Sequence, residues 1–127
     1  MNREIAPTSI APTAAKYAHA VVSESPSRLL HTSGIVPIAP DGSVPEALAD
    51  QAAVVWANLL AILDEAGMTV TDVVSITTYV VVGGDLAPVM MARDSALGGH
   101  RAASTLVTVP ALARPEWLME IALVAAR

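Results

Sequence analysis

One acidic residue, Glu120, stands alone in a run of apolar residues near the end of the chain, 118–125. In an extended strand, Glu120 shares a side with Ala122, and Met119 and Ile121 point the other way. A carboxylate in such a strand either lies on a solvated face or is held in a cleft, where it can act as a general acid or base. The residues alone leave both alternatives open.

The other polar residues give weaker signals. Arg101 is the guanidinium nearest the start of the preceding apolar stretch, 104–109, and an isolated arginine of this kind is more often a solvated loop residue. Neither Ser33 nor Ser104 lies in the G-x-S-x-G pattern of a strained nucleophile turn. The three histidines are scattered, without the close pair or neighbouring acids that a metal site needs. We therefore expect no metal and no cofactor.

The elements that position these residues are apolar strands and two helices. Strands are expected at 17–23, 28–38, 71–82, 104–109 and 118–125, with a short edge strand at 3–6. The β-branched residues of 71–82 indicate a buried central strand. Apolar residues at helical spacing predict one helix from Pro45 to Gly67 and a second over 86–97, ended by Gly98 and Gly99. Two helices can cover only one face of such a sheet, so the other face needs a partner.

Composition points in the same direction. The chain has 127 residues, enough for one domain, and 54 % of them are apolar while only 15 % are charged. It contains no Phe, so its core must be built from Ala, Val, Leu and Ile. A domain this small cannot bury all of its aliphatic surface alone. We therefore expect a homo-oligomer in which sheets of neighbouring subunits pack together.

Charge and hydropathy exclude several classes of protein. The formal net charge is −5 and only one of the seven basic residues is Lys, so the basic surface of a nucleic-acid binder is missing. The longest apolar run, 52–63, is interrupted by Asn58 and is shorter than the roughly 20 residues of a membrane span. No apolar signal core follows the N-terminus, and there is no cysteine. We expect a soluble, cytoplasmic protein that binds neither nucleic acid nor membrane.

Five segments form an ordered series along most of the chain, from Ala11 to Ala125. They are 16–20 (KYAHA), 29–37 (LLHTSGIVP), 58–67 (NLLAILDEAG), 72–80 (DVVSITTYV) and 118–121 (LMEI). The series resembles the RidA/YjgF family of small trimeric proteins, also called L-PSP. The match is specific because all five segments occur in order with the right spacing.

This resemblance implies an α+β, chorismate-mutase-like fold with one RidA-like domain over residues 1–127. A mixed six-stranded sheet would carry two helices on one face, and three subunits would form a homotrimer with a central barrel. Small-molecule ligands would bind in clefts between subunits. Glu120 would position a water that attacks an imine carbon, with ammonia leaving. The resemblance places these residues around the ligand: Tyr17, Ser33, Gly34, Ile35, Arg101, Ser104 and Thr105.

The sequence departs from the family at the arginine that holds the substrate carboxylate, because Ser104 occupies its place. Arg101 could replace it only if the segment after Gly99 folds back or enters a neighbouring cleft, since three extended residues span about 10 Å. A glutamine of the family is also lost, to Ile35. A standard 2-imino acid deaminase is therefore not expected.

Two functions remain open, and a third is disfavoured. The first is a hydrolase that acts on a reactive imine, enamine or related metabolite, with Glu120 as its acid or base. The second is a trimeric protein that binds a metabolite without turning it over, as the loss of the arginine suggests. RNA cleavage is disfavoured by the net charge of −5.

Overall fold

The computed structural model describes residues 1–127 as two helices and six strands. The elements occur in the order β1 (Asn2–Ile5), β2 (Ala20–Ser23), β3 (Leu29–His31), α1 (Leu48–Glu65), η1 (Val70–Asp72, a 3-10 turn), β4 (Val73–Val81), α2 (Ala87–Leu97), β5 (Ala103–Val109) and β6 (Met119–Ala126). This order confirms the expected α+β class and the two expected helices.

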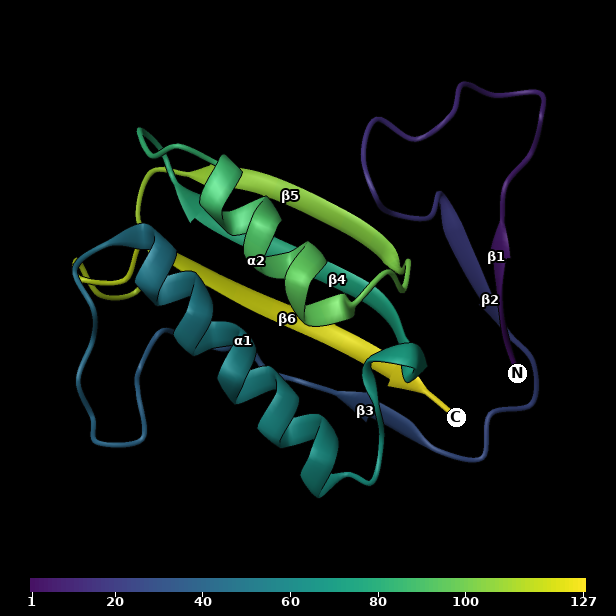
Figure 1. The fold of residues 1–127 in the computed structure, drawn as a ribbon, viewed down its shortest axis with the longest axis horizontal. Coiled ribbons are helices and arrows are strands. Elements are labelled where there is room, and N and C mark those ends of the chain that lie inside the picture. Colours follow the sequence, from purple (N-terminus) through teal and green to yellow (C-terminus); the bar gives the residue numbers. More distant parts are fainter.

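The strands form a four-stranded mixed sheet and a separate two-stranded ribbon. The larger sheet has the order β3-β6-β4-β5, in which β4 and β5 are parallel and the other neighbours are antiparallel. The ribbon of β1 and β2 lies beside it, and both helices lie on one face of the larger sheet (Figure 1). A single parallel bridge between Ala18 and Ala103 joins the ribbon's end to β5. The six strands are thus present, but they are divided between two sheets.

The core lies between the helices and the larger sheet, because side chains along the strands alternate. On β6, Met119, Ile121 and Leu123 are buried while the residues between them are only half-buried. Helix α1 supplies Leu59 and Leu63 from its inner side, both almost completely buried. Burying each such side chain stabilises the fold by about 1.5–3 kcal/mol. The helices therefore fix which face of each strand is covered.

Three expected elements are clearly shorter than the sequence suggests. The strand expected at 17–23 begins only at Ala20. The strand expected at 28–38 ends at His31 and resumes only as one bridge between Ile35 and Ile121. Helix α1 begins at Leu48 rather than Pro45, because the backbone of Ala47 is extended (φ −78°, ψ 137°). The Pro45 carbonyl oxygen accepts a hydrogen bond from the Gln51 side chain instead (2.8 Å). Gly67 follows α1 with φ +65° and Gly98 ends α2 with φ +57°, which confirms both as terminating glycines.

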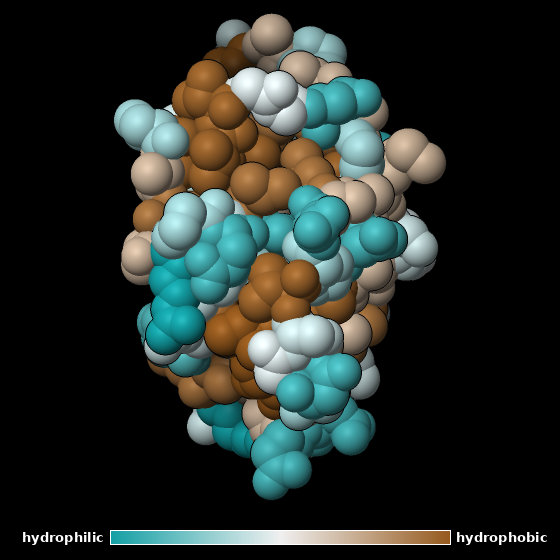
Figure 2. Space-filling model, turned by 90° about the vertical axis from the view of Figure 1, so that its left-hand side faces the viewer, coloured by the Kyte–Doolittle hydropathy of each residue, from teal (hydrophilic) through white to brown (hydrophobic).

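The face of the sheet away from the helices has no covering element. Strand β4 is central as expected, but only one of its faces is buried. The buried residues of this strand are Val73, Ile76, Thr78 and Val80. Apolar surface is also exposed at the edge of the molecule that lies on the left of Figure 1, where apolar side chains gather in two areas separated by a polar band (Figure 2). Neither helix combines the length and hydrophobicity of a membrane-spanning segment. Much apolar surface is thus left outside the core of one chain.

Candidate functional site

Strand β6 places Glu120 on the uncovered face of the sheet. Its Cα is paired with that of Tyr79 on β4, and its neighbours Met119 and Ile121 are fully buried on the helix side. Because strand side chains alternate, the Glu120 carboxylate points away from the helices. Glu120 is half-buried even without a second layer over this face.

A β-bulge beside β6 brings the backbone against this carboxylate. The N–H of Thr32 donates to the Leu123 carbonyl (3.0 Å), and the N–H of Ile35 donates to that of Ile121 (2.7 Å). Between these bonds β6 advances two residues while the facing segment advances three, so Ser33 and Gly34 occupy the space of one residue. The bulge explains why the strand expected at 28–38 is interrupted.

The missing side chain of Gly34 lets the Glu120 carboxylate lie directly against the backbone of this bulge. A Cβ built on Gly34 would fall on Oε2 of Glu120, so no other residue fits while the carboxylate keeps its position. Ile35, the next residue, is paired with Ile121 in the bridge, while Ser33 is exposed. The structure therefore brings the Glu120 carboxylate against the backbone of Gly34. The Ile35 side chain, expected beside the ligand, instead shares the face of Ile121 and packs against the core on the helix side, away from that carboxylate.

Ser104 lies on the opposite face of the sheet from Glu120. Its Cα is paired with that of Ile76, a residue that is buried against the helices. The next residue, Thr105, is exposed on the same face as Glu120, because it is paired with Thr77, which is paired with Ala122. Ser104 and Glu120 of one chain therefore cannot reach the same ligand atom.

A buried guanidinium, Arg93 of α2, lies next to Ser104. Its side chain is only 7 % exposed. Nη1 donates to the Ser104 hydroxyl (3.5 Å, a long contact), and Nε donates to Oδ1 of Asp94 (3.1 Å). Nη2 is 3.0 Å from the same Asp94 oxygen, but it has no hydrogen-bond partner with good geometry. The sequence analysis did not single out Arg93.

Arg93 and Ser104 line a pocket of about 310 Å³, which we call the Arg93 pocket. Its lining residues are Ala14, Ala15, Tyr17, Leu86, Met90, Arg93, Ser104 and Leu106. The volume is at the lower end of the range for small-molecule sites, which is about 300–1,000 Å³. Most of the wall is apolar, and Arg93 supplies its only formal charge. Tyr17 and Ser104, both expected around a ligand, are brought together here.

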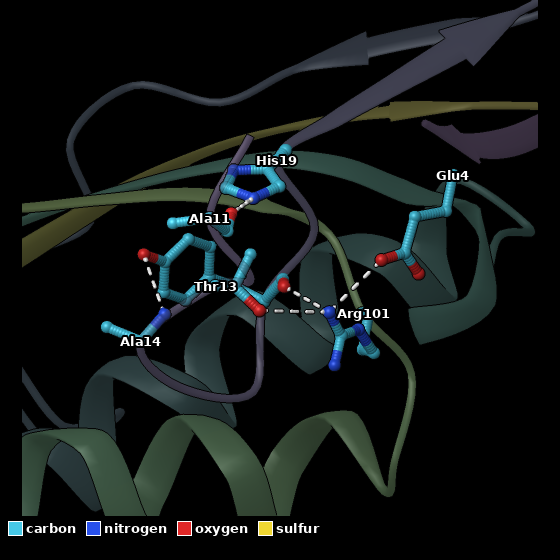
Figure 3. Close-up of polar contacts among 7 residues, drawn as sticks. Glu4, Ala11, Thr13, Ala14, His19 and Arg101 are labelled. Atoms are coloured by element: carbon cyan, nitrogen blue, oxygen red, sulfur yellow. Dashed lines mark hydrogen bonds and ion pairs between the residues drawn. The ribbon is translucent and has the colours of Figure 1, made fainter. Parts of the chain in front are cut away.

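Arg101 does not line the Arg93 pocket but holds the N-terminal segment in place. Its Nη2 donates to the Tyr17 carbonyl oxygen (2.6 Å), to Oε1 of Glu4 (3.1 Å) and to the Thr13 hydroxyl (3.2 Å) (Figure 3). A second contact, between Nε2 of His19 and the Ala11 carbonyl oxygen (2.7 Å), closes the same loop. Arg101 thus positions the segment that carries Tyr17.

The titratable groups give no sign of a metal centre. No group of three or more His, Asp or Glu side chains gathers at one place. The one resolved change in pKa concerns Asp41, whose pKa is lowered by hydrogen bonds from the hydroxyl and the backbone N–H of Ser43. Asp41 lies in an exposed turn before α1 and lines neither the Arg93 pocket nor the Glu120 bulge.

Comparison with protein families gives a match over residues 8–127 to the family described as Endoribonuclease L-PSP. The chain belongs to this family. A comparison with curated protein sequences finds no match.

Solved structures of L-PSP and Rid proteins are similar over nearly the whole chain. The Rid-family protein YyfB from Yersinia pestis is 34 % identical, with a TM-score of 0.87, over 99 % of this chain and 98 % of that one. Escherichia coli TdcF, solved with bound serine, is 27 % identical, with a TM-score of 0.73, over 96 % and 93 % of the two chains. NMB1025 from Neisseria meningitidis, a YjgF protein, is 31 % identical, with a TM-score of 0.70, over 91 % and 90 %. These comparisons confirm the RidA/YjgF resemblance and the fold class.

Proposed function

We propose that this L-PSP family protein hydrolyses a small reactive imine, enamine or related metabolite in clefts between the subunits of a homotrimer. The observation that carries the proposal is the placement of Glu120: a lone carboxylate held against the backbone of Gly34 on the open face of the sheet. Family membership supports a Rid-type small-molecule function.

Self-assembly follows from the division of the candidate residues between two faces. Tyr17 and Ser104 line the Arg93 pocket on the helix side, whereas Glu120 and Gly34 lie on the uncovered side. A ligand can meet both groups only if one subunit supplies the pocket and a neighbour supplies the carboxylate. Packing the uncovered apolar face against another subunit would create that boundary.

In the proposed reaction Glu120 orients and deprotonates a water molecule. The water oxygen bonds to the imine carbon, and the proton that Glu120 took from the water passes to the nitrogen as the C=N electron pair moves there, which gives a carbinolamine. Glu120 then takes the hydroxyl proton of the carbinolamine and transfers it to the nitrogen. The C–N bond breaks, ammonia leaves, and the oxygen electron pair forms the C=O bond of the carbonyl product. Because Ser104 replaces a strand arginine, β5 itself offers no guanidinium to a substrate. Bound serine in TdcF, 27 % identical, supports a small metabolite as ligand.

The test compares ammonia release from imines and enamines generated in situ by the wild type, Glu120→Gln and Glu116→Gln. Glu116 is an exposed acid in the loop before β6, so its variant controls for loss of one negative charge nearby. Loss of a positioned acid or base costs about 10²–10⁴-fold in rate. We expect that loss in Glu120→Gln alone. Equal rates in all three proteins would remove Glu120 from the mechanism.

A second candidate, a metabolite-binding protein without turnover, has its own supporting observation. The Arg93 pocket is complete within one chain and does not include Glu120. A ligand that fills this pocket alone would be bound without meeting the acid. Tight ligands in a thermal-shift screen, together with no turnover on the imine panel, would favour this function.

A further inference from the structure

A mostly exposed turn before α1, residues 39–43, places an aspartate directly before a glycine. The N–H of Gly42 donates to the Ala39 carbonyl oxygen (2.8 Å), and the N–H of Ala39 donates to the Ser43 carbonyl oxygen (2.8 Å). Gly42 has φ +88°, and a Cβ built on it would meet nothing within 4 Å. Asp41 is the only aspartate of the chain that a glycine follows. This turn therefore differs chemically from every other acidic position in the chain.

An aspartate before a glycine can rearrange without an enzyme, because glycine leaves its backbone nitrogen open to the preceding carboxyl group. The Gly42 nitrogen bonds to Cγ of the protonated Asp41 carboxyl, the Cγ–OH bond breaks, and the hydroxyl and the amide proton leave as one water molecule. Water then opens the five-membered imide at either carbonyl carbon. Opening at the former backbone carbonyl carbon gives isoaspartate, in which the main chain runs through Cβ and Cγ and the former carbonyl becomes a carboxylate.

Hydrogen bonds within the turn oppose this rearrangement. Oδ1 of Asp41 accepts from the backbone N–H of Ser43 (3.0 Å) and from the Ser43 hydroxyl (2.7 Å). These bonds lower the pKa of Asp41 and keep its carboxyl ionised, and an ionised carboxyl has no hydroxyl to lose. The Gly42 nitrogen is held in turn by its bond to Ala39. Ring closure therefore requires the turn to open and the carboxyl to be released from Ser43.

We propose that Asp41 is a site of spontaneous isoaspartate formation and that Ser43 restrains its rate. The turn lies outside the hydrophobic core cluster, so it can open while the domain stays folded. Asp85 provides a comparison within the same chain, because it is exposed and its Oδ1 also accepts the backbone N–H two residues later, that of Ala87 (3.0 Å). Asp85 is followed by Leu86, however, so we expect at least tenfold less isoaspartate there.

The test incubates the wild type, Ser43→Ala and Ser95→Ala at pH 7 and 37 °C and samples them over several weeks. Ser43→Ala removes the 2.7 Å bond to Asp41, so we expect isoaspartate at position 41 to form at least threefold faster than in the wild type. Ser95 is an exposed serine of α2, and its variant should form isoaspartate at the wild-type rate.

Mass spectrometry with electron-transfer fragmentation distinguishes isoaspartate from aspartate in the digested samples. Cleavage after glutamate places Asp41 and Asp85 in separate peptides, since Glu46 and Glu65 lie between them. In water enriched in ¹⁸O, residue 41 should gain one ¹⁸O atom in the isoaspartate and in the aspartate that re-forms, because water opens the imide.

A second measurement follows the turn itself by hydrogen exchange. Isoaspartate adds one carbon to the main chain between Ala39 and Ser43, so the Ala39 amide should exchange faster in aged than in fresh protein. The proposal would be overturned by Ser43→Ala that forms no isoaspartate at position 41 or forms it at the wild-type rate. Equal amounts at positions 41 and 85 would overturn it as well. None of these outcomes depends on the proposed hydrolysis.

Discussion

The fully buried side chain of Gln51 ties helix α1 to the loop before β6. Its Nε2 donates to the carbonyl oxygens of Pro45 and Glu116, both at 2.8 Å, and its Oε1 accepts from the N–H of Leu118 at 2.8 Å. The exchange Gln51→Glu keeps the shape of the side chain but replaces the donor with oxygen. Two carbonyl oxygens would then face a carboxyl group in the interior.

The size and pH dependence of the loss follow from these contacts. The introduced carboxyl, when protonated, could still donate to one carbonyl, so the neutral form loses one hydrogen bond, about 1 kcal/mol. Ionisation inside the fold is opposed by burial and by the two carbonyl oxygens, which raises the pKa of the introduced carboxyl above its ordinary value of about 4.3. Keeping it protonated costs about 1.4 kcal/mol for each pH unit above that value. The full loss is therefore about 5 kcal/mol at pH 7 and about 2.5 kcal/mol at pH 5.5.

Urea denaturation followed by Trp56 fluorescence measures this loss, since Trp56 is almost completely buried. The wild type, Gln51→Glu and Ala53→Glu are compared at one protein concentration at pH 5.5 and pH 7. Ala53 is exposed on the same helix, so its variant should differ from the wild type by less than about 0.5 kcal/mol. A folded-state pKa above the unfolded one means that stability is lost as pH rises. An equal loss at both pH values, or none at pH 7, would refute the reasoning.

Two further predictions concern the Glu120 bulge and the turn before α1. Gly34→Ala places a Cβ where Oε2 of Glu120 lies, so the carboxylate must move, and we expect the rate of imine hydrolysis to fall at least tenfold. The control Ser33→Ala changes the exposed neighbouring residue and should have little effect on this rate. An unchanged rate in Gly34→Ala would show that the close approach of Glu120 to the backbone is unimportant. The Asp41 carboxyl should titrate with a pKa below its ordinary value of about 3.9, because hydrogen bonds from Ser43 stabilise its ionised form. The stabilisation from these hydrogen bonds is therefore complete above about pH 3.9 and is lost as the pH falls through the lowered pKa. Carbon-detected NMR titration measures this midpoint, which should rise in Ser43→Ala, and a midpoint that does not move would contradict the assignment.

The larger part of the fold is predictable because it follows from short-range patterns. The spacing of apolar residues and the terminating glycines place α1 and α2 to within three residues. The side of β6 on which Glu120 lies follows from strand alternation alone, and the structure agrees. These features depend only on residues that lie close together in the sequence.

The unpredicted features depend on contacts between distant segments. The bulge at Ser33 and Gly34 arises from pairing with β6, about 90 residues later in the chain. From the sequence alone, the apolar residues on both sides of the bulge predict one uninterrupted strand. The sequence makes Arg101 a candidate ligand group, but its partners Glu4, Thr13 and Tyr17 come from the other end of the chain. Sequence spacing carries no information about either contact.

Arg93 was missed although a signal was present. It follows Val89 by four residues and precedes Leu97 by four, and all three are buried on α2. An arginine at helical spacing between two core residues is a buried arginine, and a buried arginine needs a partner. Strand β5 carries Ser104 where the family resemblance places an arginine, and the guanidinium nearest to Ser104 comes from helix α2.

The N-terminal loop held by Arg101 has a consequence for how such proteins can diversify. It supplies Ala14, Ala15 and Tyr17 to the wall of the Arg93 pocket, yet these residues are absent from the hydrophobic cluster that stabilises the chain. Insertions and substitutions in this loop can therefore alter which compounds fit without a matching penalty in folding. Selection can adjust chemical preference at the chain's beginning and leave the scaffold untouched.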